Sequence, residues 1–126
     1  MKVKRAAAVF FVDRVEPTRD FFKRVGFAVT VEIPDGNAVG FAMLERDGVQ
    51  VMVETRDNDH EPQALRDVTL KSRHAAVFVE VDDLDAVIAS LAGEKVLIER
   101  HKTFYNSDEL TYEAPGGHLV TFARFA

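Results

Sequence analysis

The sequence contains no cysteine, and no apolar run in it approaches the ~20 residues that an α-helix needs to span a bilayer. The missing cysteine excludes disulfides, thiolate metal sites and cysteine nucleophiles, and it agrees with a reducing compartment. The basic segment 1–5 precedes an apolar stretch that stops at Asp13 without a cleavage-like site. We therefore interpret this stretch as a first strand rather than a signal peptide, and we expect a cytoplasmic protein with no membrane partner.

Concentrated positive charge is also missing. The chain has 16 lysines and arginines against 21 aspartates and glutamates, a net charge of -5, and its basic residues are spread along the sequence. A phosphate-binding surface needs basic side chains gathered into a stripe, so we expect no nucleic-acid partner. At 126 residues the chain fits a single domain, 1–126, that buries roughly two-thirds of its unfolded surface.

The first half of the chain, 1–55, predicts one helix and four strands. An apolar run at 6–12 is followed by Pro17, which suits the first turn of a helix, and Gly26 suits the end of that helix. Turn sequences at 34–37 and 46–48 separate the remaining strands. We expect these strands at 27–33, 38–44 and 49–54.

The second half, 74–126, repeats this order after a polar linker at 56–73, in which we expect one short helical turn at 63–66. An apolar strand at 75–81 precedes Asp82 and Asp83, which suit the start of a helix. The remaining elements expected are the end of that helix at Gly93 and strands at 96–99, 110–114 and 119–125.

A constant offset of 69 residues relates the two halves. It matches Val12 to Val81 and Phe22 to Leu91. Strand, acidic helix start, helix, glycine stop and final strand recur in one order, which predicts an α+β fold made of two tandem β-α-β-β-β modules.

Three segments resemble those of the vicinal oxygen chelate superfamily, which includes glyoxalase I, extradiol dioxygenases and the fosfomycin and bleomycin resistance proteins. They are the first helix at 19–27, the start of the second helix at 79–85, and the closing turn and strand at 113–122. The segment 105–109 resembles the metal-free, bleomycin-resistance-like members. The resemblance covers essentially the whole chain and implies a curved mixed sheet around a small-molecule cavity, usually in a homodimer.

The resemblance also implies four strand positions that bind a divalent metal in the catalytic members. In this chain they fall on Ala7, Met52, Ala76 and Thr121. Alanine has no donor atom, a thioether is a poor ligand for hard ions, and a neutral hydroxyl is weak. We therefore expect no metal and no cofactor, although a displaced metal site at His74 and Glu54 stays open as an alternative.

Side-chain alternation along the strands predicts the lining of the implied cavity. The candidate ligand-binding residues are Val9, Phe11, Gln50, Met52, Glu54, His74, Phe78, Tyr105, Tyr112 and Thr121. Such a lining suits a flat or partly apolar molecule held by stacking and a few hydrogen bonds. That these residues simply fill the core stays open.

Three functional hypotheses follow from these residues. The first is metal-independent binding or sequestration of a small molecule in a dimeric cavity. The second is a lyase, isomerase or dioxygenase of the same superfamily, using a displaced metal or Glu54 as a weak candidate for a general base. The third is a structural dimerisation module whose cavity is filled by its own side chains.

Overall fold

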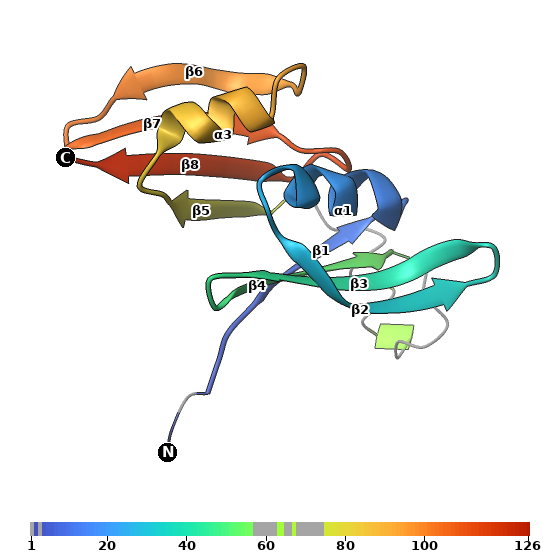
Figure 1. Cartoon of the computed structure of the whole chain (residues 1–126). Helices are drawn as coiled ribbons and strands as arrows, with labels where there is room; N and C mark the ends of the chain where they lie inside the picture. The colour runs from blue at the N-terminus through green and yellow to red at the C-terminus, as the bar shows by residue number, and fades with distance from the viewer. Residues whose placement is uncertain (1, 3, 57–62, 65–66, 68–74) are drawn as a thin grey trace. The chain divides into compact units, whose positions relative to one another are not determined.

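The structure, a computed structural model, describes residues 2, 4–56, 63–64, 67 and 75–126. The chain divides into two compact units, Met1–Arg73 and His74–Ala126. Each unit folds as a strand, a helix and three further strands (Figure 1). The predicted tandem β-α-β-β-β fold is therefore confirmed.

The first unit contains a four-stranded mixed sheet in the order β1-β4-β3-β2. Its elements are β1 (Ala8–Val12), α1 (Val15–Arg24), β2 (Ala28–Asp35), β3 (Ala38–Arg46) and β4 (Val49–Thr55). The second unit has the matching order β5-β8-β7-β6. Its elements are β5 (Ala76–Glu80), α3 (Leu84–Ser90), β6 (Val96–Lys102), β7 (Ser107–Glu113) and β8 (Leu119–Phe125).

The predicted offset of 69 residues is present in the strand register. Val9 lies across from Met52 in the parallel pair of β1 and β4. Phe78 lies across from Thr121 in the parallel pair of β5 and β8. Both partners of the second pair lie 69 positions after those of the first, so the two modules share one pairing scheme as well as one element order.

Aromatic side chains form the core of the first unit between α1 and the sheet. Phe22 of α1 stacks on Phe10 of β1 with ring centroids 5.7 Å apart, and it meets Phe27 edge to face at 5.5 Å. Phe10, Phe21 and Phe22 are all at most 1% exposed. Burying a side chain of this size contributes roughly 1.5–3 kcal/mol, so this cluster holds α1 on its sheet.

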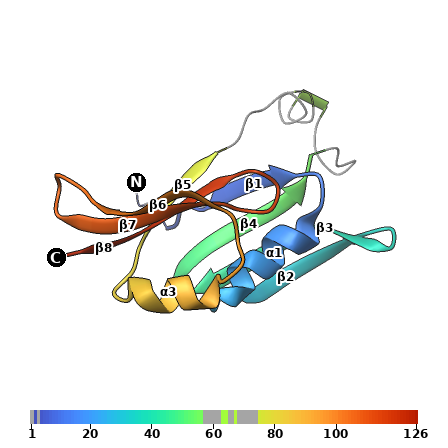
Figure 2. The same cartoon turned by 90° about the horizontal axis from the view of Figure 1, so that it is seen from above.

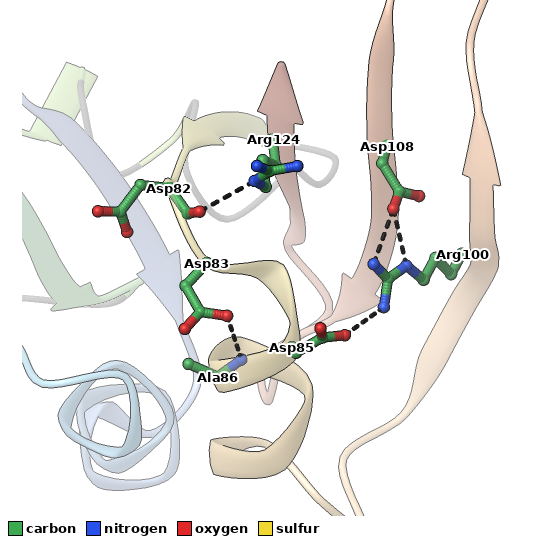
Figure 3. A network of polar contacts seen from close by, with 7 residues as sticks. All are labelled: Asp82, Asp83, Asp85, Ala86, Arg100, Asp108 and Arg124. Carbon is green, nitrogen blue, oxygen red and sulfur yellow. Dashed lines mark hydrogen bonds and ion pairs between the residues drawn. The ribbon is translucent and has the colours of Figure 1, made fainter. Parts of the chain in front are cut away.

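The helix of the second unit starts as its acidic sequence predicts. The side chain of Asp83 accepts a hydrogen bond from the backbone nitrogen of Ala86 at 3.0 Å (Figure 3). This bond satisfies one of the amide groups that a helix start leaves without a partner. Leu84 and Leu91 are each 1% exposed, and they form the apolar side of the α3 segment.

Two predicted boundaries differ from the structure in an instructive way. β7 begins at Ser107 rather than at Leu110, and β6 continues to Lys102 rather than stopping at Glu99. His101 pairs with Glu109 and Lys102 with Asp108, so the polar residues before Leu110 belong to the ladder. Their backbone hydrogen bonds, and not the hydrophobicity of their side chains, extend these strands.

The linker prediction, 56–73, and its helical turn at 63–66 lie mostly outside the described residues, as does the candidate residue His74. Figure 2 gives a second view of the described elements. Among these residues, no helix combines the length and the apolar composition required to cross a membrane.

Candidate functional site

The contacts of Arg100 show which face of the second sheet the helix α3 covers. Arg100 of β6 donates through Nη1 to Asp85 of α3 at 2.5 Å, and through Nε and Nη2 to Oδ2 of Asp108 at 2.9 and 2.8 Å (Figure 3). Asp108 of β7 therefore lies on the face that α3 covers. Because side chains alternate along a strand, Glu109 and Thr111 lie on the opposite face.

Three aromatic rings gather on this opposite face. Phe78 and Phe125 have ring centroids 6.2 Å apart, and Phe125 and Tyr105 also lie 6.2 Å apart. Phe78 is 50% exposed, Phe125 is 40% exposed and Tyr105 is 43% exposed. We call these three rings the aromatic patch. It presents apolar ring surface on which a flat molecule can stack.

A row of polar groups adjoins the aromatic patch. The Tyr105 hydroxyl donates to both carboxylate oxygens of Glu109, at 2.9 and 3.0 Å, and the Ser107 hydroxyl donates to Oε2 at 2.8 Å. Further along the same face, the hydroxyls of Thr111 and Thr121 lie 2.6 Å apart. The face therefore combines ring surface with oriented hydrogen-bonding groups.

Glu109 has donors around its carboxylate but no cation. It is 8% exposed, and within the described part of the chain no lysine, arginine or histidine forms an ion pair with it. A carboxylate offers roughly four acceptor positions, and among the residues that the structure describes only two hydroxyl protons are directed at it, one shared by Tyr105 between both oxygens and one from Ser107. Buried charges in proteins are ordinarily paired, so this carboxylate is suited to a positively charged or N–H-bearing group supplied from outside.

Tyr112 does not lie on this face, so the expectation that its hydroxyl reaches into a pocket there is wrong. It is 1% exposed and packs edge to face on Phe122, with ring centroids 6.0 Å apart. Its position on β7 is one residue from Thr111 and four from Asp108, which places it on the α3 side. Tyr112 is a core residue of the second unit.

The candidate residues of the first unit share one face. Phe10 and Val12 are buried on the α1 side, so Val9 and Phe11 lie on the opposite side of β1. In the register, Val9 lies across from Met52 and Phe11 across from Glu54. Val9, Phe11, Met52 and Glu54 therefore lie on one face of the first sheet.

Gln50 and Glu54 have different surroundings on that face. Gln50 accepts a hydrogen bond from Arg5 at 2.9 Å and donates to Glu45 at 3.2 Å, so its amide is already engaged near the strand end. Glu54 is 7% exposed and lies across from Phe41 on β3 as well as Phe11 on β1. Its carboxylate is thus flanked by two aromatic side chains.

The donor chemistry at the four implied metal positions does not fit a divalent metal. Ala7, Met52, Ala76 and Thr121 together provide one thioether and one hydroxyl as side-chain donors. Over the described ranges, 4–56 and 75–126 included, no three histidine, aspartate or glutamate side chains gather at metal-binding spacing. The side chains at the four positions therefore offer a divalent metal fewer good ligands than it needs.

Sequence reasoning does not identify Ser107, Glu109 and Phe125 as site residues. The resemblance singles out the segment 105–109, but the apolar pattern predicts a strand that begins only at Leu110. For Ser107 and Glu109 the available signal is the period-two alternation along β7. Extended back from Leu110 and Tyr112 it places Glu109 with Thr111, on the face away from the core.

Solved structures of other proteins share this fold, whereas no curated protein matches the chain. The crystal structure of TioX from Micromonospora sp. ML1 is 21% identical, with a TM-score of 0.77 over 98% of this chain and 100% of that one. The crystal structure of lactoylglutathione lyase from Agrobacterium tumefaciens is 10% identical, with a TM-score of 0.75 over 98% and 95% of the two chains.

A third structure, of a glyoxalase/bleomycin resistance protein/dioxygenase from Nocardioides, is 17% identical, with a TM-score of 0.65 over 99% of this chain and 87% of that one. At these identities the likeness shows the fold. The sequence profile of a known family also matches residues 4–122, nearly the whole chain. The chain belongs to the Glyoxalase/Bleomycin resistance protein/Dioxygenase superfamily.

Proposed function

We propose that this protein binds and sequesters a small molecule without using a metal, and that the ligand is flat and carries a positive charge or N–H donors. The observation that supports this is the juxtaposition of Glu109 with the aromatic patch. A buried carboxylate without a cationic partner among the described residues lies beside exposed rings on one face of the second sheet.

Two interactions with different physical origins support binding at this face. Stacking on Phe78, Phe125 and Tyr105 removes apolar area of both partners from water, at roughly 25 cal/mol per Å². A cation or N–H group at Glu109 adds a charge-assisted hydrogen bond, worth roughly 1.5–3 kcal/mol when formed to a charged group. The first interaction accepts any flat aromatic, and the second selects among them.

Titration with matched aromatic probes tests the proposal. Proflavine is cationic, anthracene-9-carboxylate is anionic and 9-anthracenemethanol is neutral, and all three are flat and fluorescent. The chain has no tryptophan, so probe fluorescence is read with little protein background. We expect saturable binding of proflavine, with an affinity at least tenfold above that of the anionic probe. Absence of saturable binding for all three probes would contradict the proposal.

Two variants separate the contributions. Glu109→Gln keeps the shape of the side chain and removes its charge, so it should reduce the preference for proflavine over the anionic probe from at least tenfold to less than threefold. Phe78→Ala should lower the affinity for all three probes, because it removes ring surface on which they stack. Leu97→Ala is the matched control, since Leu97 is also 50% exposed and is not part of the aromatic patch. It should leave all three affinities unchanged.

Dimerisation is part of the proposal and rests on the family resemblance. Sedimentation equilibrium at the protein concentrations used for the titrations measures it directly. A homodimer is expected. If the protein is a monomer and still binds proflavine, the ligand binds on the face of a single chain and not in a dimeric cavity.

A further inference from the structure

A hollow lies at the turn end of the β6–β7 hairpin. It has a volume of about 150 Å³, and Lys102, Asn106, Asp108 and Arg124 contribute to its lining. Asp108 lies on the face that α3 covers, because Arg100 joins it to Asp85 of that helix. The charged side chains of the hollow, Lys102, Asp108 and Arg124, are not used by the proposed ligand site, whereas Ser107 belongs to both.

Unused hydrogen-bond donors line this hollow. The Lys102 ammonium makes no hydrogen bond or ion pair with any residue the structure describes. Arg124 donates through Nε to the carbonyl oxygen of Asp82 at 3.1 Å (Figure 3), and its terminal nitrogens make no further hydrogen bond within the described part of the chain. The lysine ammonium has three N–H donors and the two terminal nitrogens of the guanidinium have four, and all of them belong to cationic groups.

The single acidic side chain of the described lining is already neutralised. Arg100 binds Oδ2 of Asp108 through two nitrogens. Arg100 lowers the pKa of Asp108 below its ordinary value, and the charges of Lys102 and Arg124 act in the same direction. Among the side chains that line the hollow, Lys102 and Arg124 are cationic and Asp108 carries the single carboxylate, so these side chains have an excess of one positive charge; Ala126 also contributes to the lining. A cationic hollow with unpaired donors attracts anions.

We propose that this hollow binds a small oxyanion, the phosphate or carboxylate group of a small molecule, between Lys102 and Arg124. Guanidinium and ammonium groups are the side chains that proteins use for such groups, because they combine charge with several N–H donors. A volume of about 150 Å³ accommodates one group of this size and not an extended polyanion. The two cationic side chains of this site, Lys102 and Arg124, take no part in the proposed aromatic ligand site.

A nuclear magnetic resonance titration of the ¹⁵N-labelled protein tests this site. Inorganic phosphate and acetate are added separately at constant ionic strength, with chloride as the balancing anion. We expect saturable shifts of the amides of 102–108 and 124, with little change elsewhere. If phosphate saturates the shifts at a lower concentration than acetate, the site is one for phosphoryl groups. If acetate saturates them at a lower concentration, the site is one for carboxylates. Saturation by neither anion overturns the proposal.

Variants locate the binding. Lys102→Met keeps most of the side-chain length and removes the charge, so it should lower the affinity for the anion at least fivefold. Lys23→Met is the control, because Lys23 is an exposed lysine of the first unit, and it should change nothing. Asp108→Asn removes the acidic group from the hollow and should tighten binding severalfold. Unchanged affinity in both Lys102→Met and Asp108→Asn would overturn the proposal, whatever the stability of either variant.

Discussion

The Tyr105 hydroxyl donates to both carboxylate oxygens of Glu109, at 2.9 and 3.0 Å. The two residues lie four positions apart, on either side of the turn at Asn106, whose backbone has a positive φ of 66°. Asparagine tolerates this left-handed conformation better than most residues. The turn thus brings an aromatic ring and its hydroxyl back over the carboxylate that begins the polar row on β7.

Tyr105→Phe should weaken this arrangement without removing the ring. The variant deletes the hydroxyl that donates to Glu109 and leaves the Ser107 hydroxyl as a donor to that carboxylate. Because Tyr105 is 43% exposed, we expect a loss of only about 1 kcal/mol in the free energy of unfolding, measured by urea denaturation. Phe104→Leu is the comparison: it removes a fully exposed ring that meets the Tyr105 ring edge to face at 5.1 Å and leaves the hydroxyl in place, so it should cost less than Tyr105→Phe. A neutral Tyr105→Phe would show that water replaces the hydroxyl at no cost.

Tyr112→Ala should be far more costly than Phe78→Ala. Tyr112 is 1% exposed and packs on Phe122, so its truncation leaves a cavity and should cost about 3–5 kcal/mol. Phe78 is 50% exposed, so its truncation should cost less than about 1.5 kcal/mol. Paired denaturation curves measure the difference. Equal losses in the two variants would contradict the assignment of Tyr112 to the core and Phe78 to the open face.

Asp108→Asn should reduce the dependence of stability on acid pH. Hydrogen bonds from Arg100 lower the pKa of Asp108 in the folded protein. The stability linked to this group is therefore present above the pKa of the unfolded chain, and it is lost as pH falls through the lower, folded pKa. We expect a shallower fall in the melting temperature for the variant between about pH 5 and pH 2.

The matched comparison for that experiment is Asp35→Asn, at an exposed carboxylate of the first unit for which no ion pair with a described residue is present. It should retain the acid dependence of the unmodified protein. If Asp108→Asn and Asp35→Asn give superimposable pH profiles, the Arg100 pair contributes nothing to acid stability.

Gly26→Ala should destabilise the first unit more than Gly36→Ala. Both glycines have positive φ, 87° and 61°, which costs an alanine roughly 1 kcal/mol at either site. At Gly26 an added Cβ would also collide with the Arg46 guanidinium, which donates to the carbonyl of Val25, whereas nothing lies within 4 Å at Gly36. Thermal melts of the two variants measure the added cost of displacing Arg46. Identical melting temperatures would show that Arg46 moves aside freely.

The fold was predictable from the sequence because the helix starts, the turn residues and the alternation of apolar positions all indicate the same order of elements. The helix start at Asp83 was visible in the sequence, and its side chain does accept from Ala86. The 69-residue offset is repeated in the pairing of Val9 with Met52 and of Phe78 with Thr121, since both modules bury the same alternating apolar positions. The limits of β6 and β7 were not predictable, because polar residues such as Asp108 join a strand through backbone bonds alone.

Residue type and spacing therefore settled the element order, the duplication and which side chains of the first sheet share a face. They did not settle the faces of the second sheet, where Tyr112 and Tyr105 are indistinguishable as residue types. The structure separates them, because a strand that starts at Ser107 commits each following side chain to one face. Packing on Phe122 buries Tyr112, while the turn at Asn106 carries Tyr105 over Glu109. These contacts join residues from different strands and turns, so they exist only in the folded chain.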